Sequence, residues 1–108
     1  MPINYISAQK ASVTTVTTCY QPTTSSTVQA TMIGCLLANT NTVTATATVT
    51  LINNGATVTT NIIKNVQIPS GNSLDILNAA RIVVPYNYQV QVTASPAVDV
   101  TISSIEVT

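Results

Sequence analysis

Apolar and polar residues alternate strictly along residues 42–51, TVTATATVTL. The odd positions from 43 to 51 are apolar, and the even positions from 42 to 50 are all threonine. A period of two places successive side chains on opposite faces of a β-strand, so this segment predicts a long strand with one buried face. Asn54-Gly55 follows it, and such a pair favours a type I′ hairpin because both residues tolerate positive φ. The partner strand is predicted at 56–64.

Similar alternation and short apolar runs predict further strands, each bounded by turn-forming residues. The strands are predicted at 12–20, 28–38, 73–78, 88–94 and 98–107, with turns at 22–27, 39–41, 69–72, 84–87 and 95–97. No segment shows a convincing helical period. The spacing of these strands predicts an all-β domain, an antiparallel β-sandwich of the jelly-roll or Greek-key type with seven or eight strands.

Residues 1–10 show no clear alternation. We expect them to form an N-terminal arm that pairs with a neighbouring molecule. The remaining residues, 11–108, have the length of one sandwich domain.

The predicted strand at 28–38 is apolar on both faces. Ile33, Cys35 and Leu37 lie on one face by simple alternation, and Met32 and Leu36 lie on the other. A second apolar face is either central in the fold or covered by another molecule. We therefore expect Met32 and Leu36 to contact a neighbouring molecule.

The last predicted strand, 98–107, changes its apolar parity at Ser103-Ser104. Val98, Val100 and Ile102 share one parity, whereas the next apolar residues have the other. This change predicts a β-bulge at the two serines, or a strand end that packs against something new.

The composition changes the picture from a free monomer to a member of an assembly. Charged residues make up 6% of the 108 residues, against about a quarter in ordinary soluble domains. They are Lys10, Lys64, Arg81, Asp75, Asp99 and Glu106, and the net charge is zero. Such a surface has little charge repulsion to keep copies apart, so the residues point to a structural role in an ordered assembly.

The same composition argues against several kinds of chemistry. The sequence has no histidine, which removes Ser-His-Asp, Cys-His and histidine–metal arrangements. The acidic residues lie on different predicted elements, so no carboxylate pair is indicated. Without a basic run there is no electrostatic footprint for nucleic acid. We expect no enzymatic activity, no cofactor and no metal.

Cys19 and Cys35 are the only cysteines. If 12–20 and 28–38 form a hairpin that turns near Ser25, Cys19 lies opposite about residue 31 and well away from Cys35. We therefore expect two reduced, buried thiols. The N-terminus lacks the features of a secretory signal, and the near-apolar run at 32–38 is too short to span a bilayer, so we expect synthesis and use in a cytoplasm without a membrane partner.

Four stretches succeed one another from about Thr27 to the end: TVQATMIGCLLANTNT, TVTATATVTLINNGATVT, IKNVQIPSGNSLDIL and RIVVPYNYQVQVTASPAVDVTISSIEV. The most specific part is KNVQIPSGNSL, followed by an apolar strand, a turn, VQVTAS and the terminal VDVTI strand. This order resembles a family of small all-β virion proteins of tailed bacteriophages. The resemblance implies a β-sandwich attached to the head, neck or tail of a virion that is assembled in the host cytoplasm.

Within that resemblance we expect a capsid decoration or cement protein. It would form a homotrimer and contact the major capsid protein or other virion proteins. A neck or tail component is the alternative within the family. A carbohydrate-binding module of a tail or adhesin is the alternative from another class, because tyrosines can line a sugar site.

This chain departs from the family in two places that suggest contact surface. The family tends to have a glycine-containing acidic turn where Val83–Tyr88 reads VVPYNY here, and a polar residue where Leu36 stands. The candidate contact residues are Ile3, Tyr5, Ile6, Met32, Leu36, Tyr86 and Tyr88.

Overall fold

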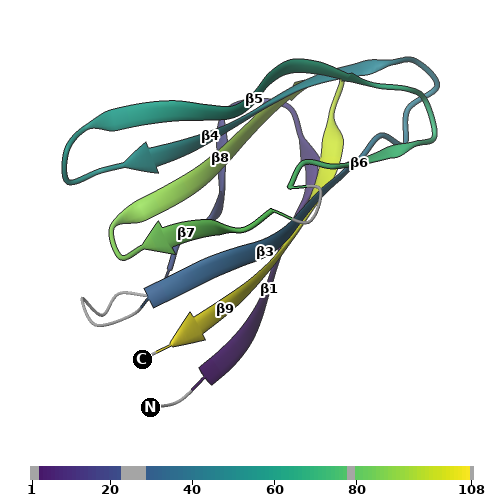
Figure 1. The fold of residues 1–108 in the computed structure, drawn as a ribbon. Coiled ribbons are helices and arrows are strands. Elements are labelled where there is room, and N and C mark those ends of the chain that lie inside the picture. Colours follow the sequence, from purple (N-terminus) through teal and green to yellow (C-terminus); the bar gives the residue numbers. More distant parts are fainter. Residues whose placement is uncertain (1–2, 23–28, 78–79, 108) are drawn as a thin grey trace.

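The computed structural model describes residues 3–22, 29–77 and 80–107, and these residues form two packed β-sheets (Figure 1). The strands are β1 (Ile3–Val13), β2 (Thr17–Tyr20), β3 (Gln29–Ala38), β4 (Ala45–Asn53), β5 (Val58–Ile68), β6 (Ser73–Asp75), β7 (Ile82–Pro85), β8 (Tyr88–Ser95) and β9 (Val98–Val107). None of the described residues forms a helix that could cross a membrane.

The strand order is that of a jelly roll. Sheet A runs β1-β9-β3, with β6 and β7 paired to different parts of the other side of β3. Sheet B runs β2-β8-β4-β5, and every pairing in both sheets is antiparallel. The chain passes back and forth between the sheets, as two Greek keys do. The predicted antiparallel β-sandwich is confirmed, with nine strands in the described residues.

Small and β-branched side chains fill the space between the sheets. Ala45, Ala47 and Val49 of β4 are buried, while the threonines that alternate with them are half-buried on the outer face. The strand begins at Ala45, three residues later than predicted. Val43, which the alternation placed on the buried face, is exposed and lies before the strand. Burial of apolar area contributes about 25 cal/mol per Å² and is the main stabilising term here, since the core contains few polar groups.

A bulge in β3 corrects the expected faces of that strand. Met32 pairs with Ser104 and Gly34 pairs with Ser103, so Ile33 is an extra residue in the ladder. The side chains on the two sides of the bulge therefore change parity. Met32 points into the core with Cys35 and Leu37, whereas Ile33 and Leu36 point outward.

The prediction that Met32 lies on the outer face with Leu36 is therefore wrong. Its side chain is fully buried within the chain and cannot contact a neighbouring molecule. Strand β9, by contrast, keeps regular alternation to its end, with Ser104 and Glu106 buried in line with Ile102. The bulge expected at Ser103-Ser104 lies across the ladder, in β3.

The first described residues form a strand of the sandwich. Ile3–Lys10 pairs residue by residue with Val107–Val100 of β9. The strand expected at 12–20 is divided, because β1 ends at Val13 and β2 starts at Thr17 in the other sheet. Pairing of this segment with a neighbouring molecule stays a prediction, and it has to involve the side of β1 that faces away from β9. Residues 1–2 and most of the loop expected at 22–27 lie outside the described residues.

The β4–β5 hairpin has a longer turn than the sequence predicted. Asn53 and Val58 are the last paired residues, so 54–57 form the loop. Among the described residues of this loop, positive φ occurs at Thr57 (51°) and not at Asn54 or Gly55. The type I′ turn at Asn54-Gly55 is therefore wrong, and a side chain at Gly55 brings no positive-φ strain. That strain applies to Gly71, where φ is 75°.

Asn39 ties two turns together at the end of the sandwich opposite the chain termini. Its side chain is buried, and its Nδ2 donates to the backbone oxygens of Val43 and Ile68, both at 2.9 Å. Its Oδ1 accepts from the backbone nitrogen of Asn41 at 3.0 Å and from Asn41 Nδ2 at 2.9 Å. The backbone of Asn39 also bonds to the 69–72 turn. One amide side chain therefore bonds to the backbone oxygens of Val43 and Ile68 and to two donors of Asn41.

Candidate interaction surface

The outer face of sheet B is polar. Besides the threonines of β4 it presents glutamines and threonines that bond to one another. Thr18 Oγ1 donates to Gln89 Oε1 at 2.7 Å, and Gln91 Nε2 donates to Thr18 Oγ1 at 3.3 Å. Gln89 Nε2 donates to Asn54 Oδ1 at 3.1 Å. These bonds occupy the polar groups of the face while leaving it in contact with water.

The start of β1 lies beside the end of β9 (Figure 1). At this end, the outer face of sheet A exposes apolar side chains. Tyr5 is 80% exposed, Val83 61% and Ile3 60%. Ile33 and Leu36, the outward residues of β3, are also exposed. We call the surface formed by these five side chains the sheet A apolar face.

The strand register shows that Ile3, Tyr5 and Val83 belong to adjacent rows of this face, whereas Leu36 lies further along β3 in a row with Thr101 and Asp75. Tyr5 pairs with Ile105, which pairs with Thr31, which pairs with Val83. These residues therefore lie in one row across four strands, each about 4.8 Å from the next. In the adjacent row Ile3 lies opposite Val107 and Gln29, so neither row contains a charged residue. Large exposed apolar patches of this kind mark interaction sites.

Carboxylates border the face only at its far end. Asp75 of β6 lies opposite Leu36 in the ladder. Asp99 of β9 accepts a hydrogen bond from the backbone nitrogen of Ser12 at 2.9 Å. The two rows that carry Ile3, Tyr5 and Val83 contain no charged residue, and the exposed Arg81 comes two residues before Val83 in the chain.

Three of the seven candidate contact residues lie on this face, namely Ile3, Tyr5 and Leu36. Tyr86 is exposed in the turn between β7 and β8. The other three do not share that exposure: Ile6 and Tyr88 are partly buried against the core, and Met32 is fully buried.

The sequence reasoning missed Ile33 and Val83. Ile33 was placed on the inner face because the bulge in β3 was not anticipated. Val83 belongs to the apolar stretch that departs from the phage family, so that departure was the available signal for it.

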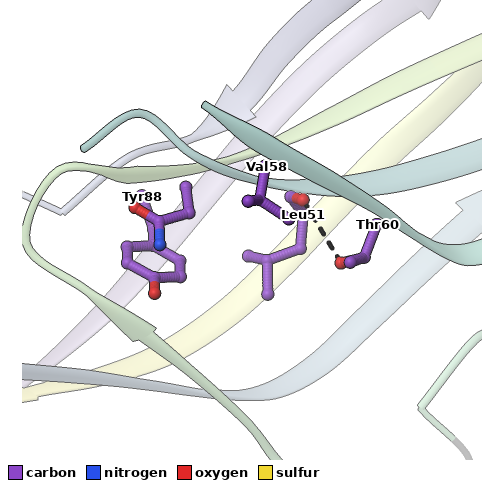
Figure 2. Close-up of a pocket in the computed structure, with 5 residues that line it drawn as sticks. Leu51, Val58, Thr60 and Tyr88 are labelled. Atoms are coloured by element: carbon purple, nitrogen blue, oxygen red, sulfur yellow. Dashed lines mark hydrogen bonds between the residues drawn. The ribbon is translucent and has the colours of Figure 1, made fainter. Parts of the chain in front are cut away.

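A hollow lies on sheet B near the hairpin that joins β4 to β5 (Figure 2). It is lined by Leu51, Asn53, Val58, Thr60 and Tyr88 and has a volume of about 200 Å³. Ligand sites in proteins usually enclose about 300–1,000 Å³. The four tyrosines also lie in different surroundings: Tyr5 on the sheet A apolar face, Tyr86 exposed in the turn between β7 and β8, Tyr88 at the hollow, and Tyr20 in the core. The described residues thus offer no shared tyrosine platform for a sugar.

A buried polar cluster connects the two sheets. The Tyr20 hydroxyl of β2 donates to Glu106 Oε2 of β9 at 2.7 Å. Ser104 Oγ lies 2.8 Å from the same hydroxyl, and it can donate because the tyrosine proton is already engaged. Burial, and then the bond to Glu106, raise the pKa of Tyr20 above its usual range. The cluster orients β2 against β9, and it faces the core where no ligand has access.

The two thiols are free and buried, as the sequence predicted. The hairpin considered between residues 12–20 and 28–38 does not form. Strand β2 pairs with β8 in sheet B, and β3 pairs with β9 in sheet A. Burial raises the pKa of Cys35 from 9.0 to about 12, and it also raises the pKa of Cys19. Neither thiol is therefore ionised near neutral pH as a nucleophile needs to be.

We expect stability to fall as the pH rises above about 9. The folded chain keeps the thiol proton of Cys35, whereas the unfolded chain loses it near pH 9.0, so alkaline pH favours unfolding. At pH 10.5 this single group accounts for about 2 kcal/mol. Urea unfolding at pH 7, 9 and 10.5 measures the effect. Cys35→Ala should be less stable at pH 7 but lose less between pH 9 and 10.5, and an equal loss in both proteins would contradict the assignment.

Across residues 3–22, 29–77 and 80–107, no three His, Cys, Asp or Glu side chains gather as metal ligands would. The sheet A apolar face is therefore the feature of this structure that most resembles a functional site.

Comparisons with known proteins identify the fold. No family model and no curated protein matches the sequence. A structure of Bacillus endospore appendages, described as disulfide-linked pili, matches 97% of this chain and 83% of its own, with a TM-score of 0.54 and 16% identity. A structure of the infectious bursal disease virus particle matches 96% of this chain with a TM-score of 0.58 and 13% identity.

A second structure of that virus, the Gx strain, matches 97% of this chain with a TM-score of 0.54 and 12% identity. The present chain spans 30% and 36% of the two viral chains, so it corresponds to one part of each. At these identities the likeness shows a shared β-sandwich fold.

Proposed function

We propose that this chain is a structural protein of a bacteriophage virion, a capsid decoration or cement protein that forms a homotrimer and binds the assembled shell. The motif order from Thr27 to the end supports the phage setting. The solved structures that share the fold belong to a viral particle and to pili. Both are assemblies of protein subunits, which agrees with a structural role. The chain acts by binding and has no catalytic activity in this proposal.

The single observation that carries the proposal is the difference between the two outer faces. The outer face of sheet B carries polar side chains that bond to one another. The outer face of sheet A exposes Ile3, Tyr5 and Val83, in rows of residues across the strands that contain no charge. Burying each such side chain against a partner contributes roughly 1.5–3 kcal/mol. The face therefore gains most when it lies against the shell or a neighbouring copy.

The composition determines how attachment responds to solution conditions. With charged residues at 6% of the chain, few ion pairs can form with the shell. Salt screens exposed charges but not apolar contacts, so attachment should depend little on ionic strength. A cement protein that binds only the assembled state stabilises the shell by mass action, as any ligand of a native state does.

We expect Leu36→Asp and Tyr5→Asp to weaken shell binding by about 10-fold or more, because each removes an apolar contact and places a charge in it. Thr46→Asp on the outer face of sheet B is the matched control and should bind like the wild type. Pelleting with purified capsids across a salt series measures all of them, and circular dichroism confirms that each variant is folded.

Release of the wild type by moderate salt, or full binding of both face variants, would contradict this mechanism. Binding to purified tails and not to capsids would replace it with a neck or tail role. The copy number per virion separates the two independently, since a shell protein is present in hundreds of copies and a neck or tail protein in a small fixed number.

A further inference from the structure

Sheet A ends in a long strand with one open side. Strand β1 has 11 residues and pairs with β9, and no described strand lies on its other side. An open side presents backbone N–H and C=O groups that another strand can bond. The short edge strands β2, β6 and β7 offer only 4, 3 and 4 residues.

Natural sheets usually protect a long open edge with charges, prolines or bulges. Strand β5, the long edge of sheet B, has such protection: Lys64 lies in its middle, Asn65 has a φ of 52°, and the register shifts twice around Val49. These features bend and charge the β5 edge, so it is a poor template for a further strand.

Strand β1 has no comparable protection over Ile3–Gln9. This segment contains no charged residue and no proline, and its register with β9 is regular. Lys10, the register shift between Lys10 and Val13, and the positive φ of Ser12 all come after it. Pro2 precedes this segment in the sequence and Lys10 follows it, so the stretch without protective features is Ile3–Gln9.

The open segment is complementary to itself in an antiparallel arrangement. When two copies of Ile3–Gln9 overlap fully, Ile6 lies opposite Ile6 and Tyr5 lies opposite Ser7. Lys10 then falls beyond the paired segment, so no like charges meet. Because Ile3 and Tyr5 lie on the sheet A apolar face, the pairing also joins the apolar faces of two copies into one surface.

We propose that two copies of this chain pair β1 with β1, antiparallel about a two-fold axis at Ile6, and so extend sheet A from one copy into the next. The contact is backbone β-augmentation with the same segment on both sides. It deepens the proposed function, on which it rests for the self-assembly, and it would link copies in pairs whether or not each also belongs to a trimer.

Cysteine cross-linking tests the register. Tyr5→Cys protein mixed with Ser7→Cys protein should form disulfide-linked dimers under mild oxidation at least about 5-fold faster than either variant alone. The mixed pair lies directly opposite at about 5 Å between Cβ atoms, whereas identical residues are diagonal neighbours about 7–8 Å apart. The native Cys19 and Cys35 are buried and stay out of the reaction. Thr40→Cys, exposed in a distant turn, is the control.

A charge on the edge supplies a second measurement. Ser7→Lys should halve the mass of the largest species in light scattering, since it adds the protection that β1 lacks, and Thr40→Lys should leave the mass unchanged. Cross-links of Ser7→Cys with Thr59→Cys of β5, or no cross-links from β1 in protein that still associates, would overturn the β1–β1 contact. So would a wild type that is monomeric at tens of micromolar.

The failure of this contact and the failure of the proposed function are distinguishable. Shell binding that persists in Ser7→Lys without cross-linking from β1 would remove the contact and leave the virion role. Cross-linking at the expected positions without binding to capsids or tails would keep the contact and remove the virion role.

Discussion

Asn39→Ala is expected to lower the free energy of unfolding by about 3–5 kcal/mol, because it removes four side-chain hydrogen bonds at the end of the sandwich. The backbone oxygen of Ile68 would lose a buried donor, and that of Val43 would lose a partly buried one. Asn41 would lose the acceptor for its backbone nitrogen and one of the two acceptors of its Nδ2, which still donates to the backbone oxygen of Ala97. An unsatisfied buried group costs about 1–3 kcal/mol, so the losses at this site add up to a large fraction of the stability of a small domain.

Urea unfolding followed by circular dichroism measures this change. Thr40→Ala is the matched control, since Thr40 is exposed and adjacent, and it should change the stability by less than about 0.5 kcal/mol. A loss below 1 kcal/mol in Asn39→Ala would show that water replaces the amide and that the turns do not depend on it.

Met32→Ala is expected to cost about 2–5 kcal/mol, the range for removing a fully buried large side chain. Met32 is 0% exposed and faces the opposite sheet together with Cys35 and Leu37. Leu36→Ala, four residues along the same strand and outward, should cost less than about 1 kcal/mol in the isolated chain. The contrast tests the bulge directly, because simple alternation puts Met32 and Leu36 on the same face.

Thermal and urea unfolding of the two variants in dilute solution provide the comparison. Dilution matters because association through the sheet A apolar face would add to the apparent stability of the wild type. Equal losses in Met32→Ala and Leu36→Ala would place both side chains in one environment and contradict the bulge at Ile33.

The strands that were predicted best are those with the purest alternation. Residues 42–51 and 88–94 became the central strands β4 and β8, because a strand buried on one face needs an apolar residue at every second position. The low charge also indicated from the sequence alone a surface with little charge repulsion between copies.

The location of that surface was predicted only in part. Ile3, Tyr5 and Leu36 were identified as candidates, but Met32 was wrongly included and Ile33 was left out. One inserted residue in β3 accounts for both errors, since it exchanges the inner and outer positions for the rest of the strand. A bulge of this kind has no clear residue signature, because it depends on which strand lies alongside.

Long-range partners were also beyond the sequence. Residues 1–10 lack alternation because β1 is an edge strand, on which Ile3 and Tyr5 face solvent while Ile6 and Ala8 reach the core only partly. Glu106 lies near the end of the chain, and it is buried where Tyr20 of the other sheet donates to it. Neither environment can be derived from neighbours in the sequence.

The sequence by itself determined the all-β class, the turns rich in Asn, Gly and Pro, and a surface poor in charge, because these depend on local backbone preference and on composition. The tertiary structure decided which strands pair, where β3 gains its extra residue, and which apolar side chains are left outside. Those outcomes depend on the registers of β1, β3 and β9 with one another. A shift of one residue in such a register turns every following side chain from the core to the solvent.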